Sequence, residues 1–273
     1  MSHQLRGASA DSLATLTDLL GRAVEGGADA ARLADDLFGV SEVLRREPSL
    51  RRVATDVSVT PEAKAELVRG IFAASLDPAS LDLVAAAVGR RWAATRDLGD
   101  SLEHLGVIAV VRSADQAGQA DALEDQLFAF ERLVTDNPEL RDALSDPARS
   151  IHDKRALLHG LLDGKVAPAT VRLAEQSVAG THRTVQVAVE EYQKVAAAHR
   201  SRLVATVRVA RPLAEQDAQR LAGSLAKQYG RPVHLNVVVD PEVIGGVRVE
   251  IGDDIIDGTV VSRLDDARRR LAG

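Results

Sequence analysis

The sequence predicts a mostly α-helical protein with a small C-terminal α/β domain. In this fold class, two tandem helical bundles share a helix and are followed by a small sheet with two helices. The first observation behind this prediction is an internal repeat with a period of 90 residues, and the second is helical spacing of apolar residues in both copies. The third is a change to alternating apolar and polar residues after Arg200. We therefore expect domains over 1–100, 101–200 and 201–273.

The composition excludes several classes of protein. The chain has 273 residues, of which 45% are hydrophobic, and it contains no cysteine. Disulfides, thiolate metal sites and cysteine nucleophiles are therefore excluded, and a reducing compartment is expected. A net charge of −6 and only 3% aromatic residues disfavour nucleic-acid binding. No signal core opens the chain and no apolar run reaches the roughly 18 residues of a membrane span, so a membrane role would require partners.

The repeat is the strongest signal in the sequence. Residues 28–87 and 118–177 align without gaps and share 15 identities in 60 positions, where we expect about five by chance. The pattern indicates a duplicated helical module. In the first copy the identical residues are Ala30, Leu33, Asp35, Leu37, Phe38, Pro48, Leu50, Arg51, Asp56, Lys64, Leu67, Gly70, Pro78, Ala79 and Leu83.

The first helices of each copy follow from periodicity and from prolines. An opening helix is expected over about 11–24. The next helix carries one apolar stripe, and it ends before Pro48 or Pro138 because the residue before a proline is biased out of the α region. A short helix is expected over about 50–54. The stripe consists of Leu33, Leu37, Val40 and Leu44 in the first copy and of Leu123, Leu127, Phe130 and Val134 in the second.

The later helices of each copy have their own start signals. Thr60 is an expected N-cap, with a proline at the first helical position, and the helix continues over 63–73. Its counterpart runs over 150–162 and closes at Asp163-Gly164. A further helix begins at Pro78 in the first copy and at Pro168 in the second.

One helix has to serve both copies. The last helix of the second copy, about 184–200, maps back onto 94–110, and the opening helix of the first copy maps forward onto 101–114. We therefore expect a single helix over 97–111 that closes the first bundle and opens the second, with no linker between them.

After Arg200 the pattern becomes that of a small α/β domain. Strands are expected over 203–209 and 233–239, with a helix between them that starts after Pro212 and stops at Gly230. Two more strands are expected, near 247–251 and 255–256, before a final amphipathic helix. That helix presents Val260, Leu264, Ala267 and Leu271 on one face.

Catalytic and metal-binding patterns are poorly supported, so we expect no catalytic, cofactor-binding or metal-ligating residues. Gly245-Gly246 leads into a strand and lacks the spacing of a phosphate loop, so a structural turn is expected. Gly164-Lys165 fails the Walker pattern and is interpreted as a turn. His152 and His159 could share a helix face, but no carboxylate completes a zinc set. Acidic pairs such as Asp35-Asp36 are interpreted as solvated.

The C-terminal motif points to a known family. Residues 237–249 read VVVDPEVIGGVRV, and they are followed by Gly252-Asp253, by a DGTV segment at 257–260 and by Arg263-Leu264. This pattern closely resembles the C-terminal signature of the delta subunit of F-type ATP synthase, the mitochondrial oligomycin-sensitivity-conferring protein. The residues 137–147 resemble the N-terminal signature of the same family. The added copy over about 1–100 resembles the extended delta chains of high-GC Gram-positive bacteria.

The resemblance implies a stator role without catalysis. Members of this family join the catalytic head to the peripheral stalk, so that rotor torque drives ATP synthesis and hydrogen ion transport stays coupled to it. The implied partners are the N-termini of the alpha subunits and subunit b, with the chain peripheral on the cytoplasmic face of the plasma membrane. A helix bundle can offer a groove to an amphipathic helix. No cofactor and no nucleic acid are implied.

The resemblance also suggests which residues matter. The signature residues are expected to set turns: Asp240, Pro241, Gly245, Gly246, Gly252, Asp253, Asp257 and Gly258. In the second copy, the opening helix and the helix from Pro168 are expected to contact a partner through Leu102, Leu105, Leu173 and Ser177, although core positions explain these leucines equally well. The contact with the stalk is expected through the final helix, at Val260, Leu264 and Leu271.

Two other functions remain open from the sequence. A free-standing helical adaptor would work without an ATP synthase. A nucleotide-sensing regulatory protein would use the C-terminal α/β domain. The basic run Arg268-Arg269-Arg270 is consistent with a helix C-terminus and also with a partner that carries an acidic helix.

Overall fold

The computed structural model describes residues 5–200, 203–229, 233–240, 243, 245–251 and 254–257. Its contacts divide the chain into two compact units, Met1–Ala196 and Ala197–Gly273. We call them the helical unit and the sheet unit. Both copies of the repeat lie in the helical unit, and a boundary at residue 100 would fall inside a continuous helix.

The helices of the first copy begin and end close to the expected positions. The opening helix and the striped helix are α1 (Ala8–Glu25) and α2 (Ala30–Arg46). They are followed by α3 (Pro48–Thr55), α4 (Pro61–Phe72) and α5 (Pro78–Val88). Thr60 caps α4 as expected, because its hydroxyl accepts the backbone N–H of Ala63 at 3.3 Å.

The second copy repeats this order. It contains α7 (Ala120–Asp136), α8 (Pro138–Ser145), α9 (Ile151–Leu162), α10 (Pro168–Ala179) and α11 (Val185–Arg200). One pair of identical residues makes the same contact in both copies. Asp56 accepts the backbone N–H of Ser58 at 2.8 Å, and Asp146 accepts that of Ala148 at 2.8 Å. The same Asx turn therefore leads into α4 in the first copy and into α9 in the second.

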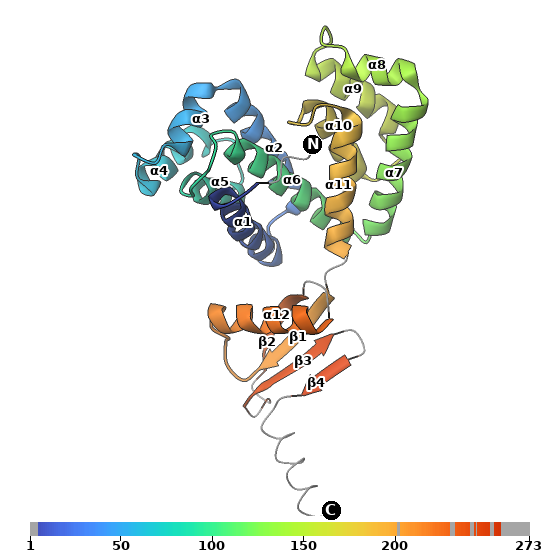
Figure 1. The fold of residues 1–273 in the computed structure, drawn as a ribbon. Coiled ribbons are helices and arrows are strands. Elements are labelled where there is room, and N and C mark those ends of the chain that lie inside the picture. Colours follow the sequence, from blue (N-terminus) through green and yellow to red (C-terminus); the bar gives the residue numbers. More distant parts are fainter. Residues whose placement is uncertain are drawn as a thin grey trace, which may run out of the picture. The chain divides into compact units, whose positions relative to one another are not determined.

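The expected shared helix is α6 (Asp97–Gln116), which runs without a break. It contacts α1, α2, α3 and α5 of the first copy and α7 and α10 of the second. Figure 1 shows α6 between the two sets of helices. As a result, most of its length is buried, and a single apolar core runs through both copies.

One acidic pair on α2 differs from its interpretation as solvated. Asp36 is buried, since it forms an ion pair with Arg32 at 3.1 Å and accepts the backbone N–H of Asp77 at 2.9 Å. Asp77 is the N-cap of α5, so Asp36 fixes the start of α5 against α2. Burial of this carboxylate is favourable because charge-assisted hydrogen bonds replace its hydration.

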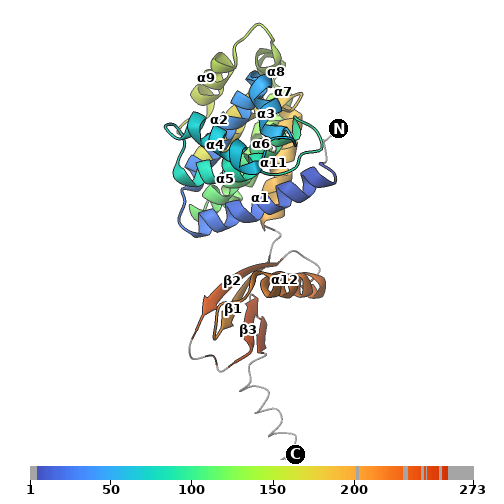
Figure 2. The same cartoon turned by 90° about the vertical axis from the view of Figure 1, so that its left-hand side faces the viewer.

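The sheet unit has a core of its own. Its strands are β1 (Leu203–Val209), β2 (Val233–Val239), β3 (Val247–Ile251) and β4 (Asp254–Asp257), in the spatial order β2-β1-β3-β4. β1 pairs with β2 in parallel across α12 (Glu215–Tyr229), and the other pairs are antiparallel. Figures 1 and 2 show α12 against one face of the sheet. Alternate residues such as Ala205, Val207 and Val249 form the core with Leu225.

Candidate functional site

The expected partner contacts of the second copy lie inside the helical unit. Leu102, Leu105 and Leu173 are fully buried, and Ser177 is 4% exposed and donates its hydroxyl to the carbonyl of Ala174 at 2.6 Å. The expectation that these four residues contact a partner is therefore corrected to a core position. The reason is that α6, as a shared helix, is covered by α2 on one side and by α10 on another.

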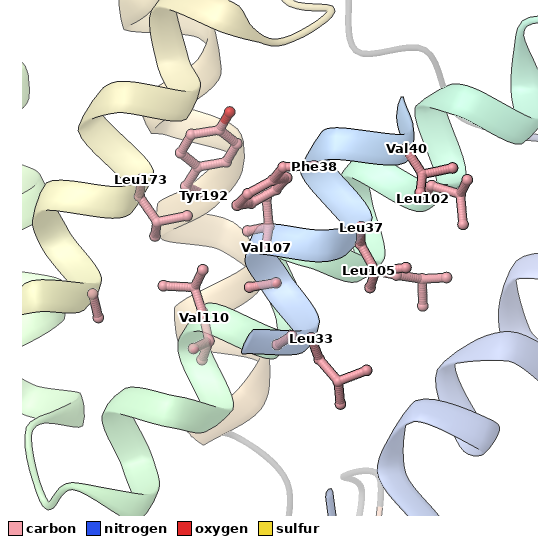
Figure 3. Packing of buried hydrophobic residues seen from close by; sticks show 14 of the residues in the cluster. Leu33, Leu37, Phe38, Val40, Leu102, Leu105, Val107, Val110, Leu173 and Tyr192 are labelled. Atoms are coloured by element: carbon pink, nitrogen blue, oxygen red, sulfur yellow. The ribbon is translucent and has the colours of Figure 1, made fainter. Parts of the chain in front are cut away.

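The packing of α2 on α6 depends on a phenylalanine and a glycine. Phe38 on α2 is 7% exposed, and a Cβ added at Gly106 on α6 would lie 2.5 Å from Cε1 of its ring. Only glycine leaves room for the ring at this distance. Figure 3 shows Phe38, Val107, Leu173 and Tyr192, which come from four helices, gathered in one region of the core.

Ion pairs between the copies surround this contact. Arg172 Nε on α10 lies 3.1 Å from Asp35 Oδ1 on α2, and Arg155 Nη2 on α9 lies 3.5 Å from Glu42 Oε2. Together with Glu175 and Gln176 these residues line a cleft of about 230 Å³. Because both arginines already bind carboxylates, the cleft is a polar seam between the copies and is poorly suited to an anionic ligand.

Buried acids of the helical unit bind loop backbone. Asp97 Oδ2 accepts the hydroxyl of Ser9 at 2.7 Å and the N–H of Ala94 at 3.1 Å. Glu103 Oε2 accepts the N–H of Thr181 at 2.9 Å. Each carboxylate therefore holds the loop that precedes the last helix of its copy, which is a structural role.

The buried tyrosine of α11 is also structural. Tyr192 is 1% exposed, and burial raises its pKa well above 10, with the nearby charge of Glu103 acting in the same direction. Its ring meets that of His182 edge to face, with the centroids 5.9 Å apart. A phenol with a raised pKa stays neutral at physiological pH and offers no general base.

The histidine pair does not form a metal centre in the described part of the chain. His159 Nδ1 lies 3.0 Å from Glu175 Oε1, and its Nε2 lies 3.8 Å from Asp163 Oδ2. No group of three potential ligands occurs among the described residues. Gly164, whose φ is +70°, forms the turn after α9, as expected.

The described signature residues form a turn in the sheet unit. Asp240 donates its backbone N–H to the carbonyl of Val209 at 2.8 Å, which extends the β1 and β2 pairing by one bond. Gly245 and Gly246 have φ of +67° and +83°, so this turn requires two glycines in succession. The turn leads into β3, where no helix N-terminus is available for a phosphate. Asp257 ends β4 opposite Arg248.

Several predicted site residues lie outside the described residues. They are Pro241, Gly252, Asp253 and Gly258 of the signature and Val260, Leu264 and Leu271 of the expected final helix. Their assignments stay predictions.

One exposed side chain was missed in the sequence. Phe128 on α7 is 58% exposed, whereas its repeat counterpart, Phe38, is buried. A signal for this position was present in the repeat: Phe38 and Phe128 are identical residues, and each lies beside the apolar stripe of its helix and not within it. Among the described residues, no helix is long and apolar enough to cross a membrane.

Comparison with known proteins decides the family. The ATP synthase delta (OSCP) subunit family matches residues 108–271. An ATP synthase subunit delta from Nocardioides sp. strain JS614 is 56% identical over 273 residues, which cover 98% of each chain. This chain belongs to the ATP synthase delta (OSCP) subunit family. The resemblance noted in the C-terminal motif is thereby confirmed.

The relatives also share the first copy. The ATP synthase subunit delta of Streptomyces coelicolor is 43% identical over 270 residues, again with 98% of each chain covered. The family match begins at residue 108, inside α6, so the first copy is shared by these full-length relatives but lies outside the family match. A chain of the Toxoplasma gondii mitochondrial ATP synthase hexamer is 21% identical over 61% of this chain, with a TM-score of 0.26 that supports no argument about the fold.

Proposed function

We propose that this ATP synthase subunit is a stator component without catalytic activity. It joins the catalytic head to the peripheral stalk through subunit b and resists the torque of the rotor during ATP synthesis. The helical unit binds the N-termini of the alpha subunits, and the sheet unit binds subunit b. The protein is peripheral, on the cytoplasmic face of the plasma membrane.

The observation that carries this proposal is the presence of two separately cored units within one family match. The helical unit and the sheet unit each bury their own apolar cluster, and residues 108–271 span both. A chain that joins two partners needs two such bodies, because each must keep its shape while the other is pulled.

The buried polar groups favour a mechanical role over chemistry. Asp97 and Glu103 are bound to loop backbone, and Tyr192 is held neutral in the core. Catalytic groups need contact with a substrate, and these side chains are occupied inside the core. The turn at Gly245 and Gly246 enters a strand, so the nucleotide-sensing alternative finds no support there.

Reconstitution tests the proposal. Membranes stripped of the head and of this subunit are recombined with purified head and with either the full chain or a variant that ends at residue 200. The full chain should return the head to the membranes, whereas the shortened variant should leave it in solution. ATP hydrolysis by the free head should be the same with either protein.

The control is the fold of the shortened variant. Trp92, the single tryptophan, is 8% exposed within the helical unit, so its fluorescence reports that the unit has folded. A folded variant that retains the head as well as the full chain does would contradict the stator proposal. A change in hydrolysis rate that depends on the variant would contradict the absence of a catalytic role.

A further inference from the structure

The chain enters and leaves the described sheet at opposite ends. It enters from the helical unit at Leu203, where β1 begins, and it leaves at Asp257, where β4 ends. β3 is antiparallel to both of these strands, so β1 and β4 run in the same direction. The register places Asp257 opposite Arg248, and it places Arg248 opposite Arg208. Asp257 therefore lies level with the far end of β1, away from the entry point.

These positions fix how a pull between the two ends acts on the sheet. A strand rises about 3.3 Å per residue, and neighbouring strands lie about 4.8 Å apart. Leu203 and Asp257 are therefore separated by about 17 Å along the strands and by about 10 Å across them. A body held at two points turns until the line between them follows the pull, which then runs about 30° from the strand direction.

A pull in this direction loads the strand pairing in shear. The hydrogen bonds of an antiparallel pair are perpendicular to the strands, so sliding one strand along the other strains all of them together. β1 pairs with β2 over its whole length and with β3 from Ala205 to Val209 (Figure 1). It therefore cannot slide unless the pairing on both sides breaks.

The side chains of β1 resist sliding as well. Ala205, Val207 and Val209 are 0–3% exposed and share a core with Leu225 of α12. Alternation along the strand places Arg208 on the other face, where its Nε lies 3.7 Å from Glu250 Oε1 on β3. Movement of β1 along its own axis would drag these buried side chains through a packed core and break this ion pair.

We propose that the sheet unit is a shear clamp, which carries tension between the partners of the chain along β1. This inference rests on the stator role proposed above, because that role supplies the load. The helical unit pulls at the start of β1. The predicted stalk contacts at Val260, Leu264 and Leu271 follow the end of β4 in the sequence, although they lie outside the described residues. A sheet whose chain entered and left at the same end would instead open one bond at a time.

Single-molecule pulling on the full chain tests the clamp. The chain has no cysteine, so two introduced cysteines are its only attachment points for the handles. One is Ala198→Cys, at an exposed position shortly before β1, and the other is Asp257→Cys in one preparation and Asp254→Cys in a second. All three positions lie in the sheet unit, so the helical unit is outside the loaded part of the chain.

Asp254 is the matched control because it is the same residue type at the other end of β4. It lies opposite Ile251, which lies opposite Ala205, so it is only about 7 Å from Leu203 along the strands. A pull there begins at one end of the strand pairing, where bonds can break in succession. The first preparation also carries Asp254→Ala and the second Asp257→Ala, so both lack the bond from Tyr229 Oη to Asp254.

At equal pulling speed, the mean unfolding force with Asp257→Cys should exceed that with Asp254→Cys by about 1.5-fold or more, because shear strains the bonds together. Loss of the sheet should release about 200 Å of chain from the roughly 60 residues between the handles, which shows that the sheet was folded. Equal forces, a lower force with Asp257→Cys, or extension without a defined step would overturn the clamp. Failure of the stator role would appear in the reconstitution and would leave these forces unchanged.

Discussion

Replacement of Gly106 by alanine should destabilise the helical unit, although alanine is the better helix former. In an open position of a helix the change would add about 1 kcal/mol of stability. At Gly106 the new Cβ would lie 2.5 Å from Cε1 and 2.7 Å from Cδ1 of Phe38, against roughly 3.5–4.0 Å for relaxed carbon contacts. Because Phe38 is 7% exposed, the ring must move within a packed core, at a cost of about 2–3 kcal/mol. The net expectation is a loss of about 1–2 kcal/mol.

Urea unfolding followed through Trp92 fluorescence measures this loss, because the tryptophan lies in the same core as Phe38. The matched control is Gly39→Ala on α2, where an added Cβ meets nothing within 4 Å, so this variant should gain up to about 1 kcal/mol. In a Phe38→Ala background, Gly106→Ala should no longer be destabilising. If Gly106→Ala were as stable as Gly39→Ala, the requirement for glycine under the ring would be refuted.

Three more predictions follow from buried and exposed polar contacts. Ser9→Ala should cost about 2–3 kcal/mol in urea unfolding, because the buried Asp97 loses a donor; a loss below about 0.5 kcal/mol would contradict that role. Asp35→Ala should cost less than about 1 kcal/mol, because its pair with Arg172 is half exposed, and a larger loss would mean that the seam between the copies is stronger than a surface ion pair. Burial raises the pKa of Tyr192, so the folded chain keeps a proton that the unfolded chain loses near pH 10, and the free energy of unfolding should fall as the pH rises beyond that point. Ultraviolet titration of the two tyrosines should show Tyr192 ionising at a higher pH than Tyr229, whose pKa is raised by desolvation and by Asp254, and a Tyr192 that ionises together with or before Tyr229 would contradict its burial.

The local elements of this fold could be predicted because their signals are local. Thr60 and Pro78 mark helix starts, and the structure begins α4 and α5 at these signals, whereas α3 begins at Pro48, ahead of its expected start near 50. The repeat predicted the shared helix by arithmetic alone, and α6 confirms it. Alternation after Arg200 likewise predicted the four described strands.

The placement of the interface residues could not be predicted because it depends on which helices meet. The spacing of Leu102 and Leu173 in the sequence fits an exposed groove and a buried core equally well. These leucines are buried because α2 packs closely on α6 and also contacts α10. That approach depends on one missing methyl group at Gly106. Similarly, the sequence predicts that Asp36 is a solvated surface acid. It is buried because the N-terminus of α5 lies beside it, where the backbone N–H of Asp77 donates to its carboxylate.

A helix that belongs to two bundles limits how the chain can be shortened. If the first 96 residues were removed, Leu98, Leu102 and Leu105 of α6 would lose the neighbours that α1, α2 and α5 supply. The remainder would then carry a bare apolar strip along its first helix, which favours aggregation in a monomer. A version without the first copy would thus need polar replacements along that strip.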